Sequence, residues 1–263
     1  MNKMRNSLIA ASVLSVVLAA GSYATEVAMD IDTELKAVSE FVWRGRILND
    51  EPCFQPSITI GSSGFSASIW GSWNLTSVSN TWQNSRVDAS FDYTFVLGKN
   101  IIRPGFVAYI YKDDPGHLAK DTYECFASYT YDVLLLPTLV VYYDFSRIDG
   151  FFATFSVAHS FELMKDRMAF DVKLTLDGAD KAFNNNLFYF PAMDDDELSS
   201  PDKTSLVDLG VAVSAPITVG KNFTITPAAK FITLLDSDTK DLVDRAGQDT
   251  SLFVYSLAIN YIF

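Results

Sequence analysis

The last residues of the chain alternate between a set of large apolar residues and a mixed set of apolar, small and polar ones. Six apolar residues occupy every second position and would share one face of an extended strand: Phe253, Tyr255, Leu257, Ile259, Tyr261 and Phe263. A terminal strand with a continuous apolar face and a final aromatic is typical of the closing strand of a transmembrane β-barrel. A half-buried terminal strand of a soluble β protein would give a similar pattern.

The same period of two recurs along the chain and predicts about twelve strands. The segment 86–97 is a clear example, because its odd-numbered positions are apolar while Asp88 and Asp92 lie on the other face. The predicted strands are 32–45, 54–61, 65–74, 86–97, 100–112, 120–132, 136–146, 150–162, 166–176, 204–217, 222–235 and 250–263.

The connections alternate in length, which favours a membrane barrel over a soluble sandwich. Odd-numbered strands precede the longer polar loops 46–53, 75–85, 113–119, 177–203 and 236–249. Even-numbered strands precede tight turns at 61–64, 98–100, 164–166 and 220–222, rich in the Gly and Asn that tight hairpins require. A transmembrane barrel has this arrangement, with short turns and both termini at one rim. The connections 132–134 and 147–150 fit less well, so the strand count carries a margin of two.

Residues 1–24 have the composition of a secretory signal peptide. Lys3 and Arg5 precede an apolar stretch over 8–21, and Ser22-Tyr23-Ala24 is a small-x-small cleavage site. The apolar stretch is shorter than the roughly 20 residues that a spanning helix needs. We therefore expect a signal peptide over 1–24 and a single barrel domain over 25–263.

Composition and charge narrow the class further. The chain is 49% hydrophobic, yet its apolar runs are short, so a membrane protein of this sequence must cross by strands. The formal net charge of -12 argues against nucleic acid as a partner, since phosphate binding needs clustered Lys and Arg. Export would permit a disulfide between Cys53 and Cys125, but two unpaired thiols remain the alternative.

The segment from 38 to 74 contains the most individual motifs of the chain. These are Val-Ser-Glu-Phe-Val-Trp-Arg-Gly over 38–45, then Gln-Pro at 55–56, then Gly-Phe-Ser-Ala-Ser-Ile-Trp-Gly-Ser-Trp over 64–73. The pattern resembles the TorF-type porin family of exported bacterial barrels, with matching residues at Ser39, Arg44, Gly45, Gln55, Gly64, Trp70 and Ser72. Ala67 or Ser68 replaces the family's second glycine, and the family's Asn is shifted to Asn74. The resemblance implies an outer-membrane barrel and a diffusion channel, and it supplies no catalytic residues.

Charged residues on the polar faces are candidates for a lumen constriction. If 32–45 is one strand with Phe41 and Trp43 facing lipid, Arg44 points into the lumen with Glu40, Asp88 or Asp92 as its partner. The candidates are Lys36, Glu40, Arg44, Trp70, Asp88, Asp92, Glu124, Asp171, Lys173, Asp208 and Lys230. They could form a charged filter or a structural ladder of ion pairs. Trp70 could stack on a ligand or fill space. The small acidic majority predicts weak cation preference.

Metal binding and catalysis have weaker support. The acidic loops at 194–197 with Asp202, and at Asp236, Asp238 and Asp241, could bind Ca²⁺, but neither has the spacing of a calcium loop, so solvated loops are favoured. His117 and His159 have no Ser–His–Asp arrangement around them. We therefore expect no enzyme activity, no metal and no cofactor.

Together these patterns predict an all-β protein, an antiparallel transmembrane β-barrel of about twelve strands in the bacterial outer membrane. Twelve strands give a backbone diameter of about 24 Å, with a bore of about 10 Å or less. We expect a monomeric porin-like channel for passive diffusion of small solutes. Its other partners would be outer-membrane lipid and the barrel assembly machinery, for which Tyr261 and Phe263 would form the insertion signal. The alternatives are a non-conducting barrel with a structural or loop-mediated binding role, and a soluble exported β protein.

Overall fold

The computed structural model describes residues 29–75, 86–111, 120–190 and 200–263. Within these ranges the chain forms a closed antiparallel β-barrel whose wall contains twelve long strands. The wall strands are β1 (Asp30–Val38), β4 (Cys53–Ser62), β5 (Phe65–Asn74), β6 (Arg86–Tyr93), β8 (Asn100–Tyr111), β9 (Thr122–Tyr131), β10 (Thr138–Asp144), β11 (Gly150–Met164), β12 (Met168–Ala179), β13 (Ser205–Ser214), β15 (Phe223–Leu234) and β16 (Ser251–Ile262). The predicted signal peptide, the acidic run 194–197 and His117 lie outside the described residues.

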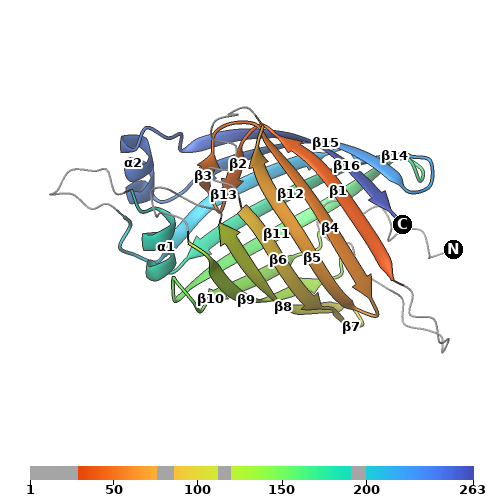
Figure 1. Ribbon diagram of the computed structural model, residues 1–263, viewed down its shortest axis with the longest axis horizontal. Helices are drawn as coiled ribbons and strands as arrows, with labels where there is room; N and C mark the ends of the chain where they lie inside the picture. Colours follow the sequence, from red (N-terminus) through yellow and green to blue (C-terminus); the bar gives the residue numbers. More distant parts are fainter. Residues whose placement is uncertain (1–28, 76–85, 112–119, 191–199) are drawn as a thin grey trace.

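Each wall strand pairs with its neighbours in the chain, and the last strand closes the barrel by pairing with the first (Figure 1). Lys36 on β1 lies opposite Ala258 on β16, which sets the register of this closure. Two short strands, β7 (Phe95–Leu97) and β14 (Ile217–Val219), continue the wall beyond β6 and β13. The predicted fold class is therefore confirmed.

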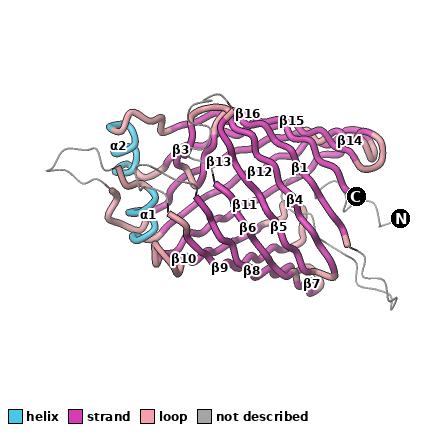
Figure 2. Tube along the Cα trace, viewed as in Figure 1, coloured by secondary structure: helices cyan, strands magenta, loops and turns pink. Residues whose placement is uncertain are grey.

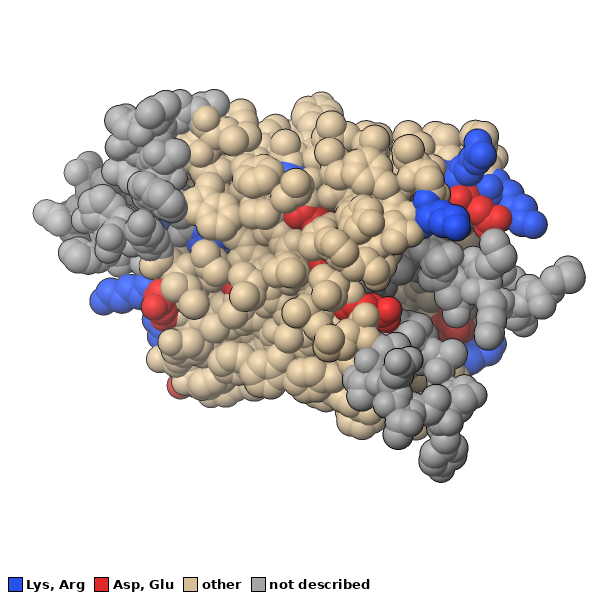
Figure 3. Space-filling model, turned by 45° about the vertical axis from the view of Figure 1, so that its right-hand side comes forward, with Lys and Arg blue, Asp and Glu red and all other residues tan. Residues whose placement is uncertain are grey.

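The outer surface is apolar along the barrel wall. On β16, Phe253 and Tyr255 are 62% and 59% exposed, while the alternate residues Ala258 and Asn260 are buried inside the barrel. Figure 3 shows one face, on which most of the surface is uncharged, Lys and Arg lie mainly towards the two ends, and a few acidic side chains are visible in the middle. A closed barrel satisfies its backbone hydrogen bonds internally, so with this apolar outer surface it is an outer-membrane type of barrel. Neither helix in the described residues is long and apolar enough to cross a membrane.

The two rims differ as the loop lengths predicted. The start of β1 and the C-terminus lie at the rim with the short turns, where Gly64, Gly98 and Gly220 adopt positive φ angles (Figure 1). The opposite rim, which we call the loop rim, carries α1 (Lys181–Leu187) and α2 (Ser237–Arg245). The doubtful connections 132–134 and 147–150 are both true connections, so the count of twelve needs no adjustment.

The first predicted strand is wrong at its C-terminal end. The wall strand β1 stops at Val38, and the next residues form a separate hairpin of β2 (Phe41–Trp43) and β3 (Arg46–Asn49), which pairs with no wall strand (Figure 2). The hairpin turn contains Arg44 and Gly45, with φ angles of 52° and 77°. Positive φ at both central residues produces a turn whose twist matches a two-stranded hairpin.

Buried side chains fill much of the space at the loop rim. Asp180 and Asp236 cap α1 and α2 by accepting hydrogen bonds from the amides of Phe183 (2.8 Å) and Thr239 (3.0 Å). The two helices pack with strand residues to form one apolar cluster: Phe152, Ala179, Phe183, Leu187, Phe188, Phe190, Val207, Leu234 and Val243. This cluster supports the hairpin from the loop-rim side, because Trp43 packs against it.

Candidate functional site: a lumen hairpin and the cavity beside it

The segment 39–52, which we call the lumen hairpin, leaves the wall at one well-defined point. The Ser39 amide donates to the Tyr255 carbonyl at 2.9 Å, and the Ser39 hydroxyl accepts from the Tyr255 amide at 3.1 Å. At the other end, Asn74 on β5 donates to the Glu51 carboxylate at 2.6 Å. These bonds fix both ends of the hairpin to wall strands.

An ion pair joins the tip of the lumen hairpin to the wall. The guanidinium of Arg44 donates from both terminal nitrogens to the two carboxylate oxygens of Glu124 on β9, each at 2.7 Å. The Tyr109 hydroxyl donates to the same carboxylate at 3.0 Å. The Arg44 and Glu124 side chains are only 7% and 0% exposed, so both depend on this pairing. The predicted partners of Arg44, which were Glu40, Asp88 and Asp92, are wrong.

Aromatic rings surround the Arg44 guanidinium. Its carbon lies 4.5 Å from the ring centre of Trp43, 4.7 Å from Tyr142, 4.3 Å from Phe152 and 4.8 Å from Phe183. A guanidinium within about 6 Å of ring centres is attracted by the negative ring faces. The prediction that Trp43 faces lipid, with Phe41, is wrong. Both are apolar because they pack inside the barrel.

Arg86 is a second buried arginine, and it was not among the lumen residues predicted from the sequence. It forms a two-point pair with Asp88, at 2.8 Å from Nε and 3.0 Å from Nη2. Its guanidinium lies 4.7 Å from the ring centre of Trp43 and 4.9 Å from that of Phe41. Arg86 is two residues from Asp88 on β6, so both side chains lie on the same face of the strand. This spacing was the sequence signal that Arg86 also points into the lumen.

The hairpin tip also contacts the wall on the side of β13 and β15. A Cβ built on Gly45 would lie 2.9 Å from a carboxylate oxygen of Asp208 and 2.9 Å from a methyl carbon of Leu234. Phe41 contacts Trp70 on β5, with ring centres 5.4 Å apart. The lumen hairpin therefore reaches wall strands on several sides of the lumen, close to the loop rim.

The other candidate residues lie along the wall or at its edge. Asp92 is loosely paired with Arg103 at 3.9 Å, and the Ser214 hydroxyl donates to Asp171 at 3.4 Å. Lys36, Lys173 and Lys230 lie on β1, β12 and β15.

Glu40 lies where the chain leaves the wall. Burial, with the negative charges of Asp249 and Asp50, raises the pKa of Glu40. Tyr261 and Phe263 lie on the outer face near the C-terminus, with ring centres 4.7 Å apart.

The remaining candidate residues have local partners. Asp202 pairs with Lys181 at 2.8 Å, while Asp236 and Asp238 both pair with Lys203 at 2.7 Å. No cluster of three or more potential metal ligands occurs in the described residues. Nδ1 of His159 lies 3.0 Å from the Leu134 carbonyl oxygen. Cys53 is buried and Cys125 is exposed, and both are free thiols.

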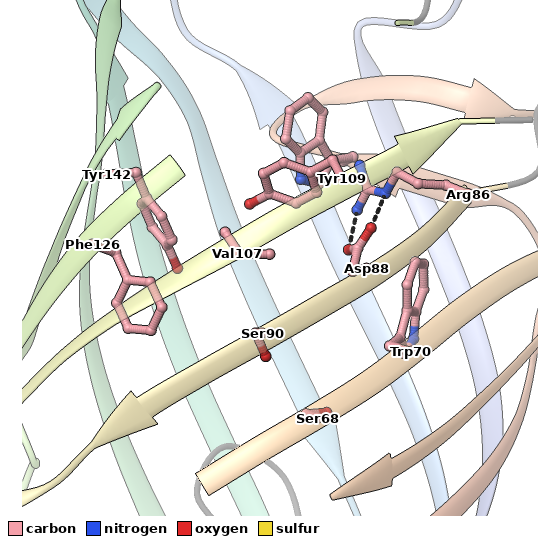
Figure 4. Close-up of a pocket in the computed structure, with 10 residues that line it drawn as sticks. Ser68, Trp70, Arg86, Asp88, Ser90, Val107, Tyr109, Phe126 and Tyr142 are labelled. Atoms are coloured by element: carbon pink, nitrogen blue, oxygen red, sulfur yellow. Dashed lines mark hydrogen bonds and ion pairs between the residues drawn. The ribbon is translucent and has the colours of Figure 1, made fainter. Parts of the chain in front are cut away.

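A cavity of about 250 Å³ lies beside the lumen hairpin (Figure 4). The cavity is lined by aromatic rings from the hairpin and the wall, by serine hydroxyls and by the Arg86–Asp88 pair. The lining residues are Trp43, Ser68, Trp70, Arg86, Asp88, Ser90, Val107, Tyr109, Phe126 and Tyr142. Of the sequence candidates, Trp70 and Asp88 line this cavity together.

These features define an outer-membrane β-barrel with a segment folded into its lumen. No family model matches the chain, and no curated protein matches its sequence. The resemblance to TorF-type porins therefore stays a prediction at the level of that family.

Several solved structures have a similar architecture. A KdgM porin has a TM-score of 0.48 at 13% identity, over 88% of this chain and 98% of that chain. A KdgM porin in complex with disordered oligogalacturonate has a TM-score of 0.48 at 12% identity, over 88% and 98%. An outer membrane channel from Pseudomonas putida F1 has a TM-score of 0.49 at 8% identity, over 95% and 100%. At these identities the likeness is one of fold.

Proposed function

We propose that this protein is a narrow outer-membrane channel for small solutes, constricted near the loop rim by the lumen hairpin. The observation that carries the proposal is the polar lining of the barrel away from the hairpin. Small polar side chains point inward from many wall strands, among them Ser66, Ser128, Ser156, Thr226 and Asn260. Polar barrel interiors are typical of water-filled channels.

The lumen hairpin would set the width of the path. It is held on the side of β9 by the pair of Arg44 with Glu124, and its tip meets Asp208 on the side of β13. Because the hairpin lies across the lumen, solutes would pass beside it. A channel of this kind would have small conductance and would exclude large solutes.

Weak cation preference remains part of the proposal. Three lumen arginines face carboxylates: Arg44 with Glu124, Arg86 with Asp88 and Arg103 with Asp92. On the wall formed by β12, β13 and β15, three acids accompany two lysines: Asp171, Asp177, Asp208, Lys173 and Lys230. Charge lining a narrow lumen selects ions, so this small acidic excess supports the preference.

Reconstitution of the mature chain into planar bilayers tests the proposal. Folding is checked first, by heat-modifiable migration on gels. We expect small conductance steps and, in a salt gradient, a reversal potential on the cation side. Folded protein that gives no steps would refute the channel, and an anion-side potential would refute the selectivity.

The second candidate function is a non-conducting barrel, in which the wall or the rim loops carry the role. The apolar cluster at the loop rim favours it, because Phe152, Phe183, Phe188 and Leu234 are almost fully buried there. Replacing residues 40–51 with a short flexible linker separates the two candidates. A channel would gain conductance, whereas a barrel sealed by the rim cluster would stay silent with and without the hairpin.

A further inference from the structure

We propose that the cavity beside the lumen hairpin is a binding subsite for one ring of a neutral sugar. The inference names a solute class for the channel proposed above and rests on that proposal. The supporting observation is that aromatic rings, serine hydroxyls and an ion pair without net charge line the same cavity (Figure 4).

Ring surfaces enter the cavity from separated wall strands. Trp70 comes from β5, while Phe126 on β9 and Tyr142 on β10 lie together with ring centres 5.6 Å apart. Aromatic rings offer flat apolar surfaces, and a sugar ring has matching patches of C–H groups on its faces. Trp70 is only half-buried, so a solute in the lumen can reach it.

Polar groups that suit hydroxyls lie beside these rings. Ser68 and Ser90 are opposite each other in the register of β5 and β6, and Asp88 lies two residues from Ser90 on the same face. The Asp88 side chain keeps 17% exposure. A carboxylate has about four lone-pair positions, so Asp88 can accept a solute hydroxyl while it stays paired with Arg86. A few convergent polar groups within an apolar lining are characteristic of small-molecule sites.

The charges around the cavity favour a neutral ligand. The guanidinium of Arg86 lies 5.4 Å from the ring centre of Trp70, and that of Arg44 lies 4.7 Å from Tyr142. A cationic solute would meet two fixed cations at these rings. An anionic solute would have to compete with the carboxylates of Asp88 and Glu124, which already bind the two guanidiniums at both oxygens.

The size of the cavity also limits the ligand. Its volume of about 250 Å³ is below the range of roughly 300–1,000 Å³ that is usual for drug-sized ligands. It corresponds to about eight waters at ~30 Å³ each. One sugar ring fits this space, and the rest of a longer sugar would remain in the lumen.

Calorimetric titration of the folded full chain in detergent tests the subsite with three probes: maltose, choline and glucuronate. We expect saturable binding of maltose, with choline and glucuronate at least ten-fold weaker. Absence of maltose binding, or a preference for either charged probe, would overturn the inference.

Two variants and one control place the binding. Trp70→Ala should weaken maltose binding at least ten-fold, and Ser68→Leu should do the same by filling the cavity. Trp73→Ala changes a tryptophan on the other face of the same strand and should leave binding unaltered. If both cavity variants fold and bind maltose as tightly as the wild type, the site is elsewhere and the inference fails.

The binding measurement does not require conduction. Conductance steps without maltose binding would refute the subsite and leave the channel. Maltose binding without any conductance would refute the channel and retain the subsite.

Discussion

Arg44 at the tip of the lumen hairpin and Glu124 on the wall strand β9 form a two-point ion pair at 2.7 Å, although 80 residues separate them in the chain. The pair is buried, so each charge is stable only with the other. It is the main polar link between the hairpin tip and the wall, and it holds the hairpin across the proposed solute path.

Removal of one partner should release the hairpin. Glu124→Gln leaves the Arg44 charge buried without its carboxylate, at a cost of about 3–5 kcal/mol in the free energy of unfolding. We expect a lower unfolding temperature and larger or noisier conductance steps, measured by thermal gel-shift and in planar bilayers.

Arg103→Gln is the matched control. The Arg103 pair with Asp92 is loose, at 3.9 Å, and the Arg103 side chain is 28% exposed. Its loss should alter both measurements only slightly. Equal effects of the two substitutions would contradict a specific role for the Arg44–Glu124 pair.

A side chain at Gly45 should disturb the hairpin tip for two reasons. The residue has a φ of 77°, which costs an alanine about 1 kcal/mol, and its Cβ would meet Asp208 and Leu234 at 2.9 Å. Gly220→Ala shares the conformational cost, with a φ of 76°, but a Cβ there meets nothing within 4 Å. Gly45→Ala should therefore lower the unfolding temperature more than Gly220→Ala. An equal decrease would show that the tip does not pack against the wall.

The ion pairs of Lys203 with Asp236 and Asp238 should make the stability of α2, measured as protection of its backbone amides against hydrogen exchange, depend on pH. Hydrogen bonds to Asp236 and Asp238 raise the pKa of Lys203. The contribution of Lys203 to the stability of α2 is therefore lost as pH rises from about 10.4 through that raised value. Burial acts to raise the pKa of Asp236, but hydrogen bonds from Lys203 and Thr239 outweigh it and lower that pKa. The Asp236 contribution is therefore lost as pH falls below about 3.9.

Hydrogen exchange of the α2 amides measures the pH range between these two limits, in which both ion-pairing partners are charged. After correction for the intrinsic exchange rate, protection should be greatest between about pH 4 and pH 10. Lys203→Met should lower protection inside the window and remove the decrease at its alkaline end. Unchanged protection in this variant would show that Lys203 does not stabilise α2.

The barrel wall was predictable because period-two alternation and loop length are local signals. The lumen hairpin was not, since Phe41 and Trp43 continue the alternation of β1 after the chain has left the wall at Ser39. Strand parity alone cannot distinguish an apolar residue that faces lipid from one on an inward hairpin.

The pairing of residues within the site could not be predicted from the sequence either. Glu124 was a candidate lumen acid, but nothing in its neighbourhood links it to Arg44, because the closing of the barrel brings them together. Gly45 was the available signal for the turn, since glycine readily adopts the positive φ that a tight hairpin needs. The positive φ of Arg44 was not predictable, because residues with a side chain rarely adopt it.

The constriction by the lumen hairpin is tested most directly by single-channel conductance in planar bilayers. The mature wild-type chain is compared with a variant in which a flexible linker replaces residues 40–51. Both proteins must first show heat-modifiable migration, so that only folded barrels are compared. We expect small steps from the wild type and several-fold larger steps from the variant. Silence from both folded proteins, or identical steps from both, would contradict a channel constricted by the lumen hairpin.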